Sequence, residues 1–359
     1  MGMRRDGSLK RFVCAMTMTV LVCMLLSGCL AHTMDPSAWQ DPQVSSITWP
    51  QAKPNPKIRL VRLIEGPFDL IEREKSAWGK ALTAILGEKD EYLDFYNPHG
   101  LAADGAGVIY ITDPPLGVIH RYDLASRSIS YIAQAGERPL GTPFGVVLDR
   151  EGNLYVTDSQ FAGIHKFNGS GEHIASFEAQ GKLQRPSGLA VNSRGDLYVA
   201  DPVANSVVIF DSRGTIRGEL SSSSAPTPFN RPMYVSVDRF DNVYVTDTLN
   251  FTVKVFDAGG TYRRSQGAIG DAPGFFARPK GISHDSDGNL YVIDSILANF
   301  QIFNPQGELL LYIGQEGGRP GEMMLPCGIF IDRHDRIYVA DTFNHRIQVF
   351  QYLKEKAGL

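Results

Sequence analysis

The chain has 359 residues, 43% of them hydrophobic, and a formal net charge of −4 at neutral pH. This length and apolar content are typical of a globular protein that buries a large core. The weak negative charge, without a basic block, excludes the broad positive surface that nucleic-acid binding requires, so no nucleic-acid partner is expected.

Residues 1–28 have the features of a secretory signal peptide. Four basic residues precede an apolar run from Phe12 to Leu26, which is shorter than the roughly 20 residues of a transmembrane helix. The run ends in the motif Leu-Ser-Gly-Cys at Cys29, which resembles a bacterial lipobox. The resemblance implies cleavage before Cys29 and attachment of palmitate-type acyl chains to that residue. The alternative is an uncleaved N-terminal anchor helix.

The residue after the lipidation site is Leu30 rather than Asp. By the same resemblance, this favours a lipoprotein of the bacterial outer membrane that faces the periplasm, over retention in the inner membrane. Two cysteines leave with the signal, so a mature monomer keeps Cys29 and Cys327 and has no pair left for a disulfide. The membrane would then be reached through a lipid anchor.

The segment before the main body divides into a tether, a strand and a helix. Residues 29–56 are rich in proline and polar residues and lack periodicity, which predicts an extended tether. Residues 58–64 alternate well enough for a strand. Residues 69–88 place their apolar side chains on one stripe, which predicts one short amphipathic helix. We group the strand and the helix as residues 57–97.

Residues 98–359 repeat a template six times: Pro-x-Gly, a short apolar strand, a polar turn, a strand ending in Tyr-x-x-Asp, a loop and an aromatic third strand. The prolines lie 43 to 47 residues apart, at Pro98, Pro143, Pro186, Pro232, Pro279 and Pro326. Such a period with about four short strands is typical of a propeller blade. The last copy supplies three strands, so strand 58–64 is predicted to complete it and close the ring. The predicted fold is an all-β, six-bladed β-propeller.

The best copies match a known repeat. The sequence DTFNHRIQVF at residues 341–350 resembles an NHL repeat, and residues 247–256 are a second good copy. The resemblance covers about residues 98–352 and implies an NHL-type six-bladed propeller. The leader, strand and helix resemble a group of bacterial NHL lipoproteins of unassigned function.

The aspartates that end the second strands are expected to be structural. They are Asp113, Asp158, Asp201, Asp247, Asp294 and Asp341. An aspartate at this place can accept hydrogen bonds from turn N–H groups, and six-fold repetition is what a structural requirement produces. We therefore assign no catalytic residue, metal or cofactor to this ring.

Positions that break the six-fold symmetry are better candidates for a site. The residue between Pro and Gly should lie at the channel mouth, and it is His99, Phe144, Ser187, Met233, Lys280 or Cys327 in the six copies. Closure of the ring makes His99 and Cys327 neighbours, and such a pair is able to ligate zinc or to form an activated thiolate. Equivalent positions offer no third metal ligand, so these residues are kept as candidate ligand-binding residues without a metal.

Three arginines precede the prolines of consecutive copies: Arg185, Arg231 and Arg278, with Lys280 beside the last. The same face is expected to carry Phe161, Phe229, Phe251, Phe275, Phe276 and Phe343 in its loops. A basic arc with exposed aromatics predicts a binding surface. The alternative is that Arg-Pro belongs to the repeat consensus and that the phenylalanines pack between blades.

The sequence thus favours an envelope-anchored binding or scaffold lipoprotein that recognises a protein or an anionic ligand on one propeller face. The alternative is a metal-dependent lyase or hydrolase in the central channel. An amidating lyase with an NHL-like propeller implies zinc-binding histidines from several blades, and His99 alone occupies such a place here. A protein partner in the cell envelope is expected.

Replacing the predicted lipid acceptor tests the anchor. Cys29→Ser removes the sulfur that would carry the lipid, so incorporation of radiolabelled palmitate should fall to background and the signal should remain uncut before residue 29. Labelling of the variant at the wild-type level would contradict the lipobox assignment.

Overall fold

The computed structural model describes residues 40–51, 54–70, 92–221 and 225–354. The predicted signal peptide 1–28, the lipidation site Cys29 and all but the first two residues of the predicted helix 69–88 lie outside the described residues. Within the described ranges, no helix is long and apolar enough to cross a lipid bilayer.

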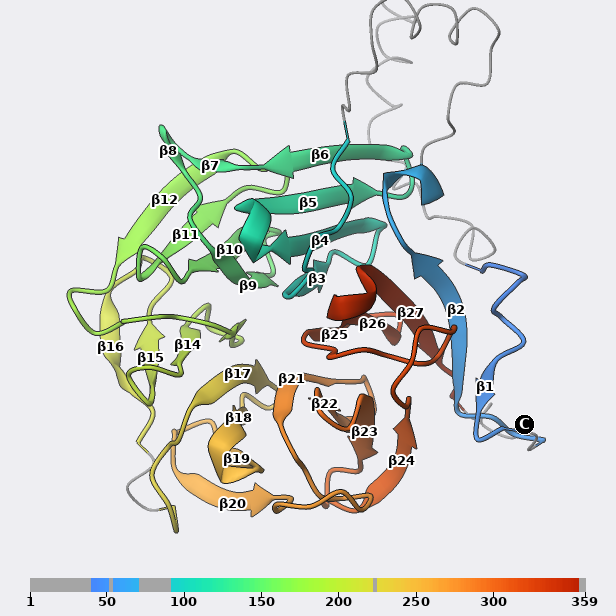
Figure 1. Ribbon diagram of the computed structural model, residues 1–359. Coiled ribbons are helices and arrows are strands. Elements are labelled where there is room, and N and C mark those ends of the chain that lie inside the picture. Colours follow the sequence, from blue (N-terminus) through green and yellow to red (C-terminus); the bar gives the residue numbers. More distant parts are fainter. Residues whose placement is uncertain (1–39, 52–53, 71–91, 222–224, 355–359) are drawn as a thin grey trace, which may run out of the picture. The chain divides into compact units, whose positions relative to one another are not determined.

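Six antiparallel sheets, the blades, surround a central axis, which confirms the predicted fold (Figure 1). Blade one has β3 (Leu101–Ala103), β4 (Val108–Asp113), β5 (Val118–Asp123) and β6 (Ser128–Ile132). Blade two has β9 (Pro143–Leu148), β10 (Leu154–Asp158), β11 (Gly163–Phe167) and β12 (His173–Glu178). Blade three has β13 (Leu189–Val191), β14 (Leu197–Asp201), β15 (Ser206–Phe210) and β16 (Ile216–Glu219).

The second half of the ring repeats this plan. Blade four has β17 (Pro232–Val237), β18 (Val243–Asp247), β19 (Thr252–Phe256) and β20 (Tyr262–Gln266). Blade five has β21 (Pro279–His284), β22 (Leu290–Asp294), β23 (Asn299–Phe303) and β24 (Leu309–Ile313). Blade six has β25 (Ile329–Ile331), β26 (Arg336–Asp341), β27 (Arg346–Tyr352), β2 (Ile58–Ile64) and β1 (Thr48–Trp49). A small hairpin, β7 (Gln134–Ala135) and β8 (Arg138–Pro139), follows blade one.

The hydrophobic cores lie between neighbouring blades. The second strand of a blade is covered on both sides, and all five residues of β10 are buried. The fourth strand faces solvent on one side, and β12 accordingly alternates between covered and exposed residues. The third-strand aromatics are at most 1% exposed: Tyr122, Phe167, Phe210, Phe256, Phe303 and Phe350. These rings fill the space between blades.

The predicted closure is confirmed, because β2 pairs with β27 in the last blade. The register runs from Ile58 opposite Tyr352 to Ile64 opposite Ile347. Ile58 and Leu60 are fully buried in a cluster that includes Phe350. A strand from the start of the described chain therefore completes the blade that the end of the chain begins, and the edge of β27 is covered.

The prediction that residues 29–56 form an extended tether is wrong for the residues of this range that the structure describes. Residues 48–49 form β1, which pairs with β2 as a fifth strand. The ring of Trp49 packs against Phe350 with 5.6 Å between ring centroids, and Val44 is only 5% exposed. The free edge of β2 offers unpaired backbone groups, and this segment covers them. A strand of two residues is too short for its periodicity to show in the sequence.

The innermost strands approach one another so closely that most positions after the Pro-x pair require glycine. A Cβ atom added to Gly281 would lie 2.5 Å from the carbonyl oxygen of Cys327 in the next blade, a severe clash. The N–H of Gly281 donates a hydrogen bond of 2.9 Å to that same oxygen. The template glycine therefore reflects backbone contact at the axis.

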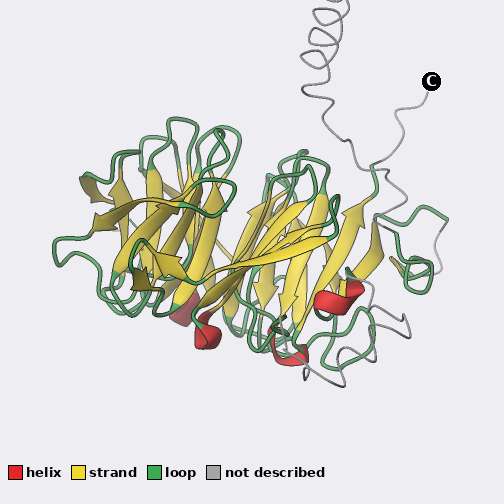
Figure 2. Cartoon of the chain, turned by 90° about the horizontal axis from the view of Figure 1, so that it is seen from above, coloured by secondary structure: helices red, strands yellow, loops and turns green. Residues whose placement is uncertain are grey.

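The propeller has two chemically distinct ends. We call the loop face the end that carries the loops between second and third strands and the segments that precede the innermost strands. The turn face is the opposite end, with the turns between first and second strands. Three short helices lie in loop-face loops, η3 (Pro114–Leu116), η4 (Thr248–Asn250) and η5 (Thr342–Asn344), and a fourth, η2 (Pro67–Asp69), follows β2. The short helices lie along one edge in the side view (Figure 2).

The closing strand should make a large contribution to stability. Leu60→Ala removes a fully buried side chain and should lower the free energy of unfolding by about 2–5 kcal/mol. Leu63→Ala, at a half-buried position of the same strand, is the matched control and should cost clearly less. Chemical denaturation of both variants provides the measurement. Equal losses would contradict the assigned burial pattern.

Candidate functional site

The six repeat aspartates organise the loop face, which confirms their predicted structural role. All six are fully buried. Asp201 accepts hydrogen bonds from the backbone N–H groups of Gln184 (2.6 Å) and Arg185 (2.7 Å). Asp294 accepts an equivalent bond from Arg278 (2.9 Å). These carboxylates therefore hold the backbone from which the candidate arginines project.

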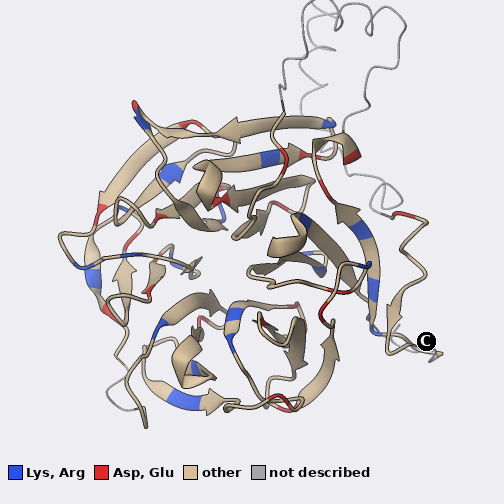
Figure 3. Cartoon of the chain, in the orientation of Figure 1, with Lys and Arg blue, Asp and Glu red and all other residues tan. Residues whose placement is uncertain are grey.

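The three pre-proline arginines lie exposed on the loop face, at the start of three consecutive blades. Within the described ranges, none of the guanidinium groups of Arg185, Arg231 and Arg278 has a hydrogen bond or ion pair. Figure 3 shows basic residues at the start of β17 and on β21. Arg231 has a φ of 57°, a left-handed conformation that costs a non-glycine residue about 1–2 kcal/mol. Its N–H donates to the side-chain oxygen of Asn205 (2.8 Å), which holds it in place.

Each blade also exposes one large apolar side chain in its loop-face loop. These six side chains, which we call the apolar ring, are 38–52% exposed: Leu116, Phe161, Val203, Leu249, Ile296 and Phe343. Phe275, 42% exposed, precedes the innermost strand of blade five on the same face. The expectation for the loop phenylalanines was wrong in part, because Phe229 and Phe276 are buried between blades and Phe251 is half-buried.

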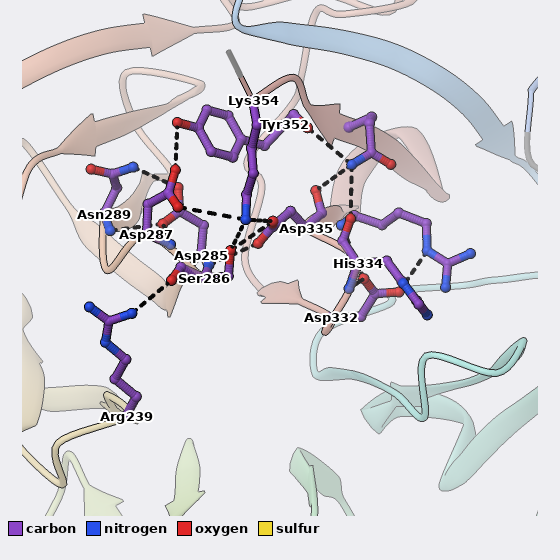
Figure 4. A network of polar contacts seen from close by, with 12 residues as sticks. Arg239, Asp285, Ser286, Asp287, Asn289, Asp332, His334, Asp335, Tyr352 and Lys354 are labelled. Carbon is purple, nitrogen blue, oxygen red and sulfur yellow. Dashed lines mark hydrogen bonds and ion pairs between the residues drawn. The ribbon is translucent and has the colours of Figure 1, made fainter. Parts of the chain in front are cut away.

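On the turn face, by contrast, charged and polar groups pair with one another across blades (Figure 4). Asp335 of blade six accepts a hydrogen bond from the Ser286 hydroxyl of blade five (2.9 Å) and pairs with Lys354 (3.1 Å). Lys354 also lies 3.6 Å from Asp287. Arg239 of blade four donates to the carbonyl of Ser286 (3.1 Å). This network links blades four, five and six and uses the charges of that face for cohesion.

A groove of about 760 Å³ opens on the turn face beside blade three. Two of its arginines are paired with carboxylates: Arg194 lies 3.2 Å from Asp196, and Arg217 lies 3.4 Å from Asp211. A guanidinium group that is already paired with a carboxylate is less available to an anionic ligand than the guanidinium groups of Arg185, Arg231 and Arg278, which have no partner within the described ranges.

Lys280, His99 and Cys327 lie at the position between Pro and Gly, which was expected at the channel mouth. The Nζ atom of Lys280 lies 3.0 Å from the Sγ atom of Cys327. The His99 ring lies 2.9 Å, through Nδ1, from the carbonyl oxygen of Asn97. A carbonyl only accepts, so Nδ1 is the donor and Nε2 is left for the thiol. His99 and Cys327 each shift the pKa of the other, which agrees with the expected neighbourhood, and Lys280 contacts the thiol directly.

The two cations alter the titration of the thiol. Burial of Cys327 acts to raise its pKa, but the charges of His99 and Lys280 outweigh burial and hold the pKa well below its usual value. Burial acts to lower the pKa of His99, and the neighbouring thiolate outweighs it, so that pKa is raised. The favoured state is a thiolate between two cations.

Tyr234 is a further residue of this region that the repeat template did not single out. The third template position is glycine in the other five blades, whereas blade four has Tyr234. The side chain is 8% exposed, and within the described ranges its hydroxyl has no hydrogen-bond partner. Phe144 lies between it and His99, with ring centroids at 5.9 Å and 4.8 Å respectively. The departure from glycine at this position is the sequence feature that could have identified Tyr234 as a candidate.

A cavity of about 200 Å³ lies in the channel and is lined by Tyr234 and by the glycines that follow His99, Phe144, Ser187 and Cys327. His284 lines it as well and has its pKa lowered to about 4 by burial. In the described part of the chain, no three His, Cys, Asp or Glu side chains are grouped so as to hold a metal ion.

Two family models match parts of the sequence. Residues 283–356 match a family described as a 6-bladed beta-propeller, and residues 183–210 match the NHL repeat. No curated relative matches the sequence significantly.

Solved structures with the same fold are distant in sequence. A streptogramin B lyase has 14% identity and a TM-score of 0.57, covering 73% of this chain and 95% of that one. A Bacteroides thetaiotaomicron protein of unknown function has 12% identity and a TM-score of 0.60, covering 72% and 70%. An auxiliary nutrient binding protein from Bacteroides ovatus has 15% identity and a TM-score of 0.58, covering 73% and 70%. At these identities the likeness shows the fold alone.

The loop-face aspartates should make stability depend on pH in the acid range. Burial acts to raise the pKa of Asp158, but bonds from His165 and from the N–H groups of Gly141 and Thr142 outweigh it and lower the pKa to about 2. A carboxyl with a lowered folded-state pKa stabilises the fold above about pH 4, and this contribution is lost as the pH falls towards 2.

The contribution is about 2 kcal/mol. The difference in unfolding free energy between wild type and Asp158→Asn, measured by denaturant titration, should therefore shrink between pH 4 and pH 2. A difference that stays constant over this range would contradict the assigned role.

Proposed function

We propose that this chain, a six-bladed β-propeller of the NHL-repeat type, is an envelope-anchored binding protein whose loop face recognises a carboxylate-bearing protein partner. The observation that carries the proposal is the combination on one face of the apolar ring with three exposed arginines whose side chains have no partner within the described ranges.

The apolar ring favours a protein over a small anion. Six separate loops each expose a large apolar side chain to water, and apolar side chains gathered on one face of a protein mark interaction sites. A small anion would contact one or two arginines and leave the ring uncovered. A protein surface is able to cover the ring and reach the arginines at the same time.

The arginines give the surface its preference for acidic groups. A guanidinium group binds a carboxylate through two parallel hydrogen bonds, which lysine does not reproduce. Arg185 and Arg278 are held by buried aspartates through their backbone N–H groups. The backbone positions are thus fixed before a partner binds, and less conformational entropy is lost on association.

The anchoring part of the proposal rests on the sequence of the N-terminal segment. Lipidation at Cys29 and sorting to the outer membrane, facing the periplasm, are proposed from the lipobox-like motif and from Leu30. The Bacteroides ovatus structure of the same fold belongs to a nutrient-binding protein, and its likeness supports the general use of this fold as a binding scaffold.

Site-specific photocrosslinking tests the binding face in intact cells. Phe343 and Phe161 of the apolar ring are replaced one at a time by p-benzoylphenylalanine, and covalent adducts are identified by mass spectrometry. Adducts to one defined protein should form from both positions. The matched control is the same replacement at Phe240, which is 67% exposed on the turn face and should give no such adduct.

Charge is then tested in the same assay. Changing Arg185, Arg231 and Arg278 together to Gln should reduce the adduct yield at least roughly tenfold, since a loss of about 1.4 kcal/mol from the three arginines together already lowers the affinity tenfold. The control triplet is Arg150, Arg194 and Arg213, three exposed arginines of the turn face. Equal loss from both triplets, or adducts from Phe240 as strong as those from the ring, would overturn the proposal.

A further inference from the structure

We propose that Cys327 is a nucleophilic thiolate at the channel mouth that reacts with small hydroperoxides, with Lys280 holding the thiolate and His99 and Tyr234 placed to protonate the oxygen that leaves. The proposal is independent of partner binding on the loop face. It rests on a cluster of four reactive or ionisable side chains that four different blades bring to one place.

The contacts of the cluster suit a nucleophile. Lys280 Nζ lies 3.0 Å from Cys327 Sγ, a hydrogen-bonding distance for sulfur. The interaction with Cys327 acts to raise the pKa of His99, while its Nδ1 is occupied by the carbonyl of Asn97. A thiolate stabilised by neighbouring cations, and not bound to a metal, remains available to attack.

Tyr234 supplies an independent indication of a ligand. Its hydroxyl is buried without a hydrogen-bond partner within the described ranges, and a buried hydroxyl of this kind is satisfied when a ligand or a water molecule binds it. Burial is the larger cause that raises the pKa of Tyr234, and the charge of Cys327 is the second. The ring packs in the apolar core of blades four and five, at the place where five blades have glycine, so packing accounts for the ring but leaves the hydroxyl without a partner.

The ionisable groups around the thiol come from blades one, four and five: His99, Tyr234 and Lys280. Blades two and three contribute Phe144 and Ser187 at the same level, which carry no charge. Within the described ranges, the charges that act on the thiol are the two cations. The site is therefore electropositive around a single anion, which activates sulfur.

The size of the site selects the class of electrophile. Cys327 is 2% exposed, and the channel cavity of about 200 Å³ is lined by Gly328, the residue that follows it, and by Tyr234. An acyl substrate needs room for a tetrahedral intermediate and a defined pair of donors for its oxyanion. A hydroperoxide needs only in-line access for two oxygen atoms and a proton for the departing one. A hydroperoxide is also neutral, so it passes the positively charged side chains at the channel mouth without needing a counter-ion.

The thiolate sulfur attacks the terminal oxygen of ROOH, an S–O bond forms and the O–O bond breaks. The departing RO⁻ takes a proton from His99 or from Tyr234 and leaves as ROH. Sulfur is oxidised to the sulfenic acid and the peroxide is reduced to the alcohol, or to water when R is hydrogen. His99 or Tyr234 regains its proton from solvent.

Hydrogen peroxide and dimedone are the probes for the test, applied to the full mature chain, with the labelled Cys327 peptide quantified by mass spectrometry. Folded wild type at pH 7 should be labelled at least about tenfold faster than the same chain unfolded in guanidinium chloride, because the unfolded thiol is mostly protonated. Iodoacetamide alkylation of folded protein should show a midpoint well below the pKa of about 8.5 of a free cysteine.

Two variants separate activation from structure. Lys280→Met should slow oxidation and move the alkylation midpoint upwards. Tyr234→Phe should slow peroxide oxidation severalfold but leave the iodoacetamide profile unchanged, because alkylation needs no proton donor, and thermal unfolding confirms that it folds.

Three results would each overturn the proposal. These are oxidation no faster in the folded chain than in the unfolded one, an alkylation midpoint near 8.5, and oxidation rates in both variants equal to wild type. Cys327→Ser gives the background of the peptide assay.

Discussion

The convergence of the innermost strands on one axis is the constraint from which the other features follow. A Cβ atom at Gly281 would lie 2.5 Å from a carbonyl oxygen of the neighbouring blade, so the backbones there touch directly. This contact fixes where each innermost strand starts, and hence the ring of side chains at the channel mouth and the row of residues just before the prolines. Blade four relaxes the constraint to admit Tyr234, and its Thr246 hydroxyl bonds within the blade (3.3 Å to the Tyr234 carbonyl). In blade one the equivalent Thr112 bonds instead to Phe144 of blade two (2.6 Å).

The two faces divide the work of the molecule. On the turn face, contacts such as Ser286 to Asp335 tie adjacent blades (2.9 Å). On the loop face, Asp201 and Asp294 accept hydrogen bonds from backbone N–H groups, and within the described ranges the side chains of the three pre-proline arginines have no partner. A single repeat unit thereby supplies cohesion at one end and, in the proposed function, a recognition surface at the other, because loops rather than strands carry the variable residues.

The repeat made the fold predictable from the sequence, and it also limited what the sequence could reveal. The prolines and the second-strand aspartates recur in every blade, so their period predicted the propeller, and the missing fourth strand of the last copy predicted the pairing of β2 with β27. The meeting of His99 and Cys327 followed from ring closure. Lys280 was named both at the channel mouth and beside the last of the three arginines, because sequence position does not say which way a long side chain turns. Its side chain contacts Cys327. Phe229 and Phe276 were expected at the surface, since loop membership does not reveal burial between blades. Tyr234 was not predicted, because a repeat template records the residues that the copies share and not the one copy that departs from them.

The pairing of β2 with β27 has a consequence for the order of events when the protein is made. The chain is synthesised from the N-terminus, so Ile58–Ile64 emerges before all six blades, and its partner Arg346–Tyr352 emerges after them. Until then, the apolar side of β2 has no blade to join. Contacts between residues so far apart in sequence form slowly, and an unpaired strand invites association with other chains. A chain that stops before Arg346 therefore keeps β2 without its partner strand, with its apolar side and its edge available for association with other chains.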